Sequence, residues 1–290
     1  MSAPTTESST TTVAADHAAL RPGTSPGRRA AGDRRRFNPA ALGQQLGALV
    51  VVLVAWTLFA RGPGADADFP TPLTTARTAV DMFGTSIYWQ AVLDTVVTMV
   101  IGFVLSVAVG VPIGLLIGSY RRVRWSTQFL VDFGRTIPGI AILPILLLNF
   151  GNTRTMALAL ILFGGVWPLI IQSSYAVQQV SPHLQQVASA FRLTRRDRFR
   201  FVFAPSVLPF LMTGLRLSAA ISLILTITAE YLGQVDGVGA NLQRMHEIHD
   251  PPRMFVYMFT AAALGMLLTL LVVAIQRRVL WWHPSERKGR

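Results

Sequence analysis

Long apolar runs separated by short basic segments dominate the sequence. Six of these runs are long enough to cross a hydrocarbon core of about 30 Å at about 1.5 Å per helical residue. They cover residues 41–60, 90–119, 126–150, 155–177, 206–232 and 254–275. The pattern predicts an all-α, polytopic membrane protein with six transmembrane helices.

The residues outside these runs divide the chain. Residues 1–40 are rich in Ser, Thr, Ala, Pro and Arg and lack apolar periodicity, so we expect a disordered basic tail. The run 41–60 is longer than the apolar core of a cleaved signal peptide, about 7–15 residues, so we expect an additional N-terminal span. Residues 61–280 are expected to form a five-helix core that includes a cytoplasmic segment at 181–205. Residues 281–290 are expected to form a short cytoplasmic tail.

The distribution of positive charge predicts the orientation. The chain has 51% hydrophobic and 14% charged residues and a net charge of +12, which in a soluble protein would suggest nucleic-acid binding. However, 19 of the 26 basic residues lie in four segments outside the spans, at 1–40, 121–124, 178–205 and 277–290. By the positive-inside rule these segments and both termini are cytoplasmic. The basic charge is therefore explained by topology, and we expect no nucleic-acid partner.

The residue inventory excludes several kinds of chemistry. The chain has no cysteine, which excludes disulfides, thiolate metal sites and cysteine nucleophiles. Lys288 is the only lysine, so there is no Gly-x-x-x-x-Gly-Lys loop for ATP. His246 and His249 lie three residues apart, but two imidazoles in a loop are weak grounds for a metal site. We expect no catalytic residue, cofactor or metal in this chain.

Small residues recur every four positions in the second span. They are Gly102, Ser106, Gly110, Gly114 and Gly118. One stripe of that helix is therefore nearly free of side chains, which lets another helix approach closely. We assign Gly110, Gly114 and Gly118 to helix packing.

Five ionisable residues fall within the predicted spans, where charges are costly and often functional. Asp132 and Arg135 are three residues apart and are expected to pair along one helix face. Arg216 and Glu230 lie within about 40° of each other on one helix but about 21 Å apart, so each needs a partner on another helix or water in a pathway. Asp94, near a span end, can reach interfacial water. All five are candidates for a translocation pathway or for structural charges.

The most informative segment covers residues 181–209, SPHLQQVASAFRLTRRDRFRFVFAPSVLP. It is strongly basic, and its apolar residues follow a helical spacing that is interrupted at Leu193-Thr194. The pattern predicts a short helix, a turn and a second amphipathic helix. Such a segment suits either a helix lying on anionic lipid or a helix offered to a protein partner.

In this segment the chain resembles the inner-membrane permeases of binding-protein-dependent ABC importers, most closely the aliphatic sulfonate, nitrate and taurine branch. In that family a Glu-Ala-Ala, three residues, Gly, nine residues, Ile-x-Leu-Pro signature docks on the ATPase subunit. Other similar stretches are FPTPL, VGVPIGLLIGSYRR, RTIPGIAILPILLLNFG and AEYLG. The resemblance assigns ATPase coupling to Gln186, Val187, Ala188, Arg192, Arg195, Arg196, Val202 and Pro205. Because Arg192 replaces the glycine, we expect a turn of different geometry.

The resemblance implies a type I permease subunit of a bacterial inner membrane. Its expected partners are a second permease copy or paralogue, ATPase subunits that bind ATP and Mg²⁺, an extracytoplasmic binding protein and membrane lipid. The expected cargo is a small, anionic solute. A rival interpretation is an ion-coupled secondary transporter that uses Glu230, Asp132 or Asp94, but the six spans show no internal inverted repeat. A membrane-embedded enzyme lacks a catalytic constellation.

Overall fold

The computed structural model describes residues 39–65 and 68–281, and these residues form helices and turns without a strand. The expected tails at 1–40 and 281–290 therefore lie almost wholly outside the described residues. The chain divides into a unit at residues 1–50 and a unit at residues 51–290. The helices are α1 (Pro39–Arg61), α2 (Pro72–Phe83), α3 (Ser86–Ser119), α4 (Arg121–Thr136), η2 (Gly139–Ile142), α5 (Leu143–Phe150), α6 (Arg154–Gln178), α7 (Pro182–Ala190), α8 (Arg195–Arg198), η3 (Phe199–Phe203), α9 (Ala204–Gly233), α10 (Val238–Glu247) and α11 (Pro251–Val279).

Four segments of the described chain are long and apolar enough to cross a membrane. They are α3, α6, the stretch Arg195–Glu247 that contains α9, and α11. A fifth candidate is a broken span that consists of α4 and the η2–α5 segment. In α1 the apolar part, Leu46–Arg61, is shorter than these. The membrane-spanning, all-α class is confirmed, and the count of six spans stays a prediction.

The prolines at 138 and 144 predict a kink in the span at 126–150, and in the structure the chain bends there by 86°. Helix α4 ends at Thr136, and Ile137 is extended, with φ −71° and ψ 117°. Pro138 follows, and the ring of a proline disfavours helical geometry in the residue before it. The apolar pattern alone does not reveal this break.

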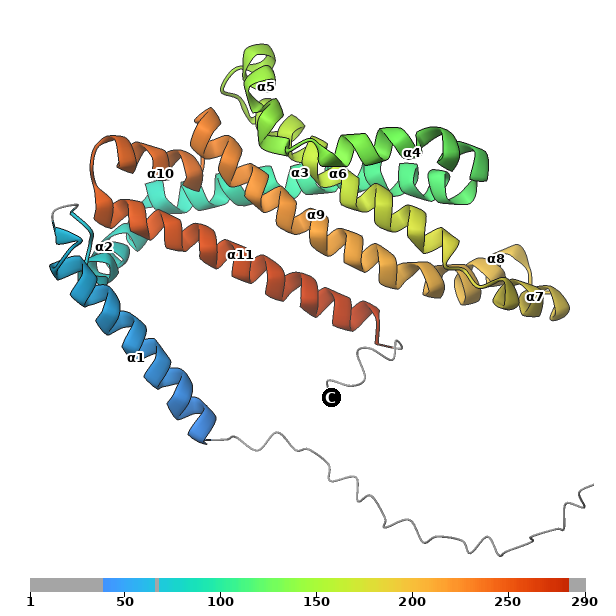
Figure 1. Ribbon diagram of the computed structural model, residues 1–290, viewed down its shortest axis with the longest axis horizontal. Helices are drawn as coiled ribbons and strands as arrows, with labels where there is room; N and C mark the ends of the chain where they lie inside the picture. The colour runs from blue at the N-terminus through green and yellow to red at the C-terminus, as the bar shows by residue number, and fades with distance from the viewer. Residues whose placement is uncertain (1–38, 66–67, 282–290) are drawn as a thin grey trace, which may run out of the picture. The chain divides into compact units, whose positions relative to one another are not determined.

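Helices α3, α6 and α9 run side by side and form the core that positions the other elements (Figure 1). The small-residue stripe of α3 faces α6, as predicted. A Cβ atom added to Gly110 would lie 2.8 Å from Leu169 Cβ, and one added to Gly114 would lie 2.5 Å from the Ile170 carbonyl oxygen. Any larger side chain would push the two helices apart.

Small residues also bring α9 against α6. The Ser218 hydroxyl donates to the Gly165 carbonyl oxygen at 2.7 Å. A Cβ atom on Gly165 would lie 2.8 Å from the Ser106 hydroxyl oxygen of α3. The three helices therefore meet in one layer of buried serine and glycine, which fixes the spacing of the core.

Candidate functional site

The segment between α6 and α9 consists of α7, a turn, α8 and the π-helix η3. The turn lies where the sequence predicts an interruption, at residues 191–194. The Thr194 hydroxyl oxygen caps α8 by accepting from the Asp197 N–H at 3.2 Å. The Arg198 guanidinium donates to the Ser189 hydroxyl at 2.9 Å and ties α8 to α7. The predicted helix, turn and second helix are confirmed as structure.

Arg192 ends α7 in a left-handed backbone conformation, with φ +49°. The Leu193 N–H donates to the Ala188 carbonyl oxygen, and the Arg192 N–H donates to the Ser189 carbonyl oxygen, both at 3.0 Å. This bonding pattern is a Schellman C-cap, in which the left-handed position usually holds glycine. Arg192 therefore adopts a conformation to which glycine is best suited, so the replacement of glycine does not prevent this turn.

The coupling candidates differ in exposure. Ala188 is only 2% exposed, so it packs within the chain and does not form part of an outward face. Val202 is half-buried and packs with an internal cluster. By contrast, Leu184, Val187 and Phe191 are 45%, 51% and 76% exposed. Of the remaining candidates, Pro205 is half-buried and the following are exposed: Gln186, Arg192, Arg195 and Arg196.

Glu230 lies at the far end of α9 and is 0% exposed. Its Oε2 atom accepts from the Thr95 hydroxyl of α3 and from the Gly239 N–H of α10, both at 2.9 Å. The Thr95 oxygen also accepts from the Val238 N–H at 2.9 Å. A Cβ atom on Gly237 would overlap the carboxyl group. Glu230 therefore joins three helices and caps the N-terminus of α10, where a negative charge is favoured.

The other candidate charges occupy separate places. Arg216 is exposed and forms no ion pair among the described residues. Arg216 and Glu230 therefore differ in environment despite their similar angle on α9, because the neighbours of a helix change along its length. Asp94 is paired with Arg154 of α6 at 2.7 Å. Sequence reasoning missed this partner, since Arg154 follows 60 residues later with no periodic signal.

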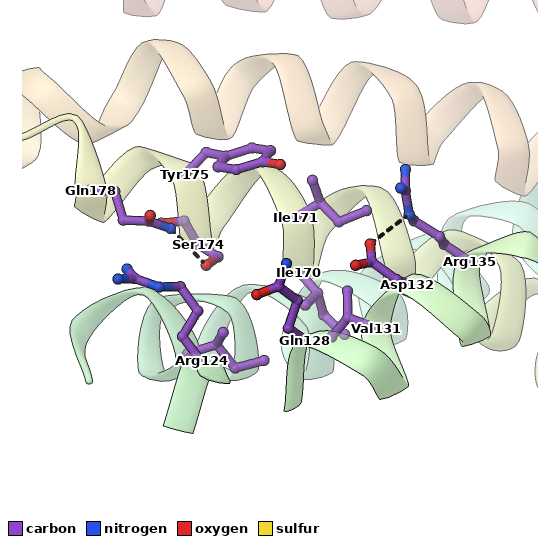
Figure 2. Close-up of a pocket in the computed structure, with 11 residues that line it drawn as sticks. Arg124, Gln128, Val131, Asp132, Arg135, Ile170, Ile171, Ser174, Tyr175 and Gln178 are labelled. Carbon is purple, nitrogen blue, oxygen red and sulfur yellow. Dashed lines mark hydrogen bonds and ion pairs between the residues drawn. The ribbon is translucent and has the colours of Figure 1, made fainter. Parts of the chain in front are cut away.

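A polar cleft of about 250 Å³ separates α4 from α6 (Figure 2). The predicted ion pair is present at one end, where Arg135 Nε lies 3.2 Å from Asp132 Oδ1. Arg124 extends from α4 toward Gln178 at the other end (Figure 2). A second cavity of about 630 Å³ shares Arg135 and Ile171 with the cleft. The two cavities therefore follow the same side of α6.

Comparison with known proteins identifies related sequences over most of the chain. A family described as "Binding-protein-dependent transport system inner membrane component" matches residues 110–280. The formylaminopyrimidine transport permease protein of Halalkalibacterium halodurans is 26% identical, with 82% of this chain and 94% of the relative covered. The nitrate import permease protein of Leptolyngbya laminosa is 26% identical, with 88% and 90% covered. A putative aliphatic sulfonates transport permease protein of Bacillus subtilis is 25% identical, with 81% and 86% covered.

Solved structures support the fold. An inward-facing structure of the MetNI methionine ABC transporter aligns with a TM-score of 0.58 and 17% identity. The alignment covers 67% of this chain and 96% of that chain. The helix arrangement is therefore that of a known transporter subunit.

Proposed function

Because the chain belongs to the family of inner membrane components of binding-protein-dependent transport systems, it is a permease component of an ABC importer, and we propose that its solute is a small anion. The solute class is supported by most of the relatives that are named for a solute, while the formylaminopyrimidine permease is named for an uncharged heterocycle. Three of them are named for nitrate, aliphatic sulfonates and bicarbonate. All three solutes are small and anionic. The ion-coupled alternative has no support among these relatives.

We propose that ATP hydrolysis in a partner subunit is coupled to this chain through the α7–η3 segment. The chain has no phosphate-binding loop, so ATP and Mg²⁺ belong to a separate ATPase subunit. Leu184, Val187 and Phe191 form an exposed apolar face on and just after α7. Such a face suits a groove on a partner, and arginines beside it speed association with acidic surfaces. This argument favours a protein partner over a helix lying on lipid.

The proposed assembly contains two permease subunits, two ATPase subunits and an extracytoplasmic binding protein. Closure of the ATPases would displace α7 and α8, and η3 continues directly into α9. Alternating access then follows from a shift between two states of the helix bundle. The charge distribution supports cytoplasmic termini in a bacterial inner membrane.

The decisive test is reconstitution in liposomes with the ATPase and binding protein of the same system. Uptake of radiolabelled ethanesulfonate or nitrate should require ATP on the cytoplasmic side and should be unaffected by collapsing the proton and sodium gradients. Uptake that follows an ion gradient without ATP would contradict the assignment. Uptake of neutral solutes only would contradict the solute class.

A further inference from the structure

The cleft between α4 and α6 carries a positive charge that the described part of the chain does not neutralise. Three charged residues line it, namely Arg124, Asp132 and Arg135. Arg135 is paired with Asp132 at 3.2 Å. The half-buried Arg124 guanidinium has no carboxylate partner within the described residues. One net positive charge therefore remains in a partly enclosed space between α4 and α6.

Hydrogen-bond donors surround the same space. Gln128 of α4 and Tyr175 of α6 line the cleft, and neither side chain forms a hydrogen bond within the described residues (Figure 2). Ile117 and Ile170 supply an apolar part of the lining. A cation with nearby neutral donors against an apolar wall is an arrangement that binds oxyanions.

The cleft lies along α6, one of the candidate membrane spans, and adjoins the second cavity. It extends along α6 as far as Gln178, at the end where α6 leads into the α7–η3 segment. The adjoining cavity continues from Arg135 and Ile171 to Gly139 and Leu225. The two cavities thus follow α6 from its cytoplasmic end toward its middle.

We propose that this cleft is a binding site for a small oxyanion in the inner half of the translocation pathway. Arg124 supplies the charge, and Gln128 and Tyr175 supply hydrogen bonds. The inference rests on the proposed function and deepens it: the permease itself selects for anions, in addition to any selection by a binding protein.

A single reporter thiol tests the site, because the chain contains no cysteine. Val131 lines the cleft, so Val131→Cys places a thiol there. The complex with its ATPase is placed in nanodiscs of zwitterionic lipid, and labelling by a small maleimide is timed. With a Kd of about 1 mM, about 10 mM methanesulfonate or nitrate should slow labelling by about tenfold. Dimethyl sulfone, a neutral analogue, should not slow the labelling of Val131→Cys. The anions should not slow the labelling of Ser126→Cys, because Ser126 lies on α4 outside the cleft.

Two charge variants should change the anion protection of the Val131→Cys thiol in opposite directions. Arg124→Gln should abolish protection by the anions. Asp132→Asn releases Arg135 from its ion pair, so protection should appear at lower anion concentration. Asp132→Asn keeps the side-chain volume and Arg124→Gln keeps a polar side chain, so a general disturbance of the cleft would not produce opposite shifts.

Several results would overturn the site. One is the absence of anion protection in the Val131→Cys complex, and another is equal protection after Arg124→Gln. A third is protection that appears only when anionic lipid is added, because this result would assign the cleft to a lipid headgroup. ATP-dependent uptake is measured in parallel on the same protein complex reconstituted in sealed liposomes. Normal anion uptake without protection would reject only this site, whereas a loss of ATP dependence in the parent complex would reject the proposed function.

Discussion

The buried carboxylate of Glu230 joins three helices by hydrogen bonds. It receives the Thr95 hydroxyl and the Gly239 N–H on one oxygen, and its second oxygen has no hydrogen-bond partner within the described residues. A buried carboxylate is costly unless such bonds compensate for lost hydration. Each donor to Glu230 therefore has a large effect on the stability of the C-terminal end of α9.

Thr95→Val keeps the side-chain shape and removes the hydroxyl. It leaves the Val238 N–H without an acceptor and Glu230 with one donor fewer, so we expect a loss of about 1–3 kcal/mol in stability. The measurement is the thermal midpoint of the purified complex in detergent.

Thr98→Val is the matched control. Thr98 lies nearly one turn away on α3, is 0% exposed and has no hydrogen-bond partner for its hydroxyl within the described residues. Its replacement should leave the midpoint unchanged or raise it. Equal losses in the two variants would contradict the role given to the Thr95 hydroxyl.

Arg192→Gly should stabilise the protein. Arg192 has φ +49°, and a left-handed conformation costs an L-residue about 1–2 kcal/mol that glycine avoids. The thermal midpoint should therefore rise. Arg196→Gly makes the same chemical change inside α8, where glycine is about 1 kcal/mol less favourable than alanine, and should lower the midpoint. A fall in both variants would mean that the Arg192 side chain makes a compensating contact.

The candidate charges were predictable from sequence only where their partners are local. Asp132 and Arg135 are three residues apart, and their pairing follows from helix geometry alone. The contact between Asp94 and Arg154 depends on how α3 and α6 pack, and so does the contact between Glu230 and Thr95. No spacing rule reveals a partner that is 60 or 135 residues away.

At the scale of elements, the glycine stripe of α3 shows a pattern that sequence could predict. A repeat of four places small residues on one helix face, and in the structure that face contacts α6. The break at Ile137 was less accessible, because an apolar run with a proline fits both a kinked helix and two separate helices. The sequence therefore predicts that these residues are helical, but it does not predict the direction in which the chain continues after Thr136.

Gly114→Ala should weaken the α3–α6 packing. The new Cβ atom would lie 2.5 Å from the Ile170 carbonyl oxygen, and overpacking of this kind costs about 1–3 kcal/mol. The thermal midpoint and the yield of assembled complex should both fall. Gly47→Ala is the control, since a Cβ atom there would meet nothing within 4 Å. An unchanged midpoint in the Gly114 variant would show that the two helices separate without cost.

Val187→Asp tests the exposed face of α7. Val187 is 51% exposed, so the charge should leave insertion and folding intact while it weakens ATPase binding. Hydrolysis stimulated by the loaded binding protein should be lost, and Val187→Leu should retain it. A charge at Ala188 is a poorer test, because that residue is 2% exposed and the variant would disturb α7 itself. Full stimulation in the Val187→Asp complex would favour a helix that lies on lipid.

At the scale of the whole molecule, the charge count predicts which residues face the cytoplasm. Arg122 and Asp236 are both exposed, and the chain contains no competing cysteine. In intact cells a membrane-impermeant thiol reagent should label Asp236→Cys and should label Arg122→Cys only after the membrane is opened. The opposite labelling pattern would invert the topology.

Helix α9 links the α7–η3 segment to α10. It is 30 residues long, or about 45 Å at 1.5 Å per residue, and it begins directly after η3. Its other end holds Glu230, which grips the first turn of α10. A single helix thus connects the α7–η3 segment, the proposed ATPase contact, with α10. A displacement of α7 should therefore be transmitted through α9 to α10. Thr95→Val removes a hydrogen bond to Glu230 and should weaken this transmission without changing a residue of α7 or α10.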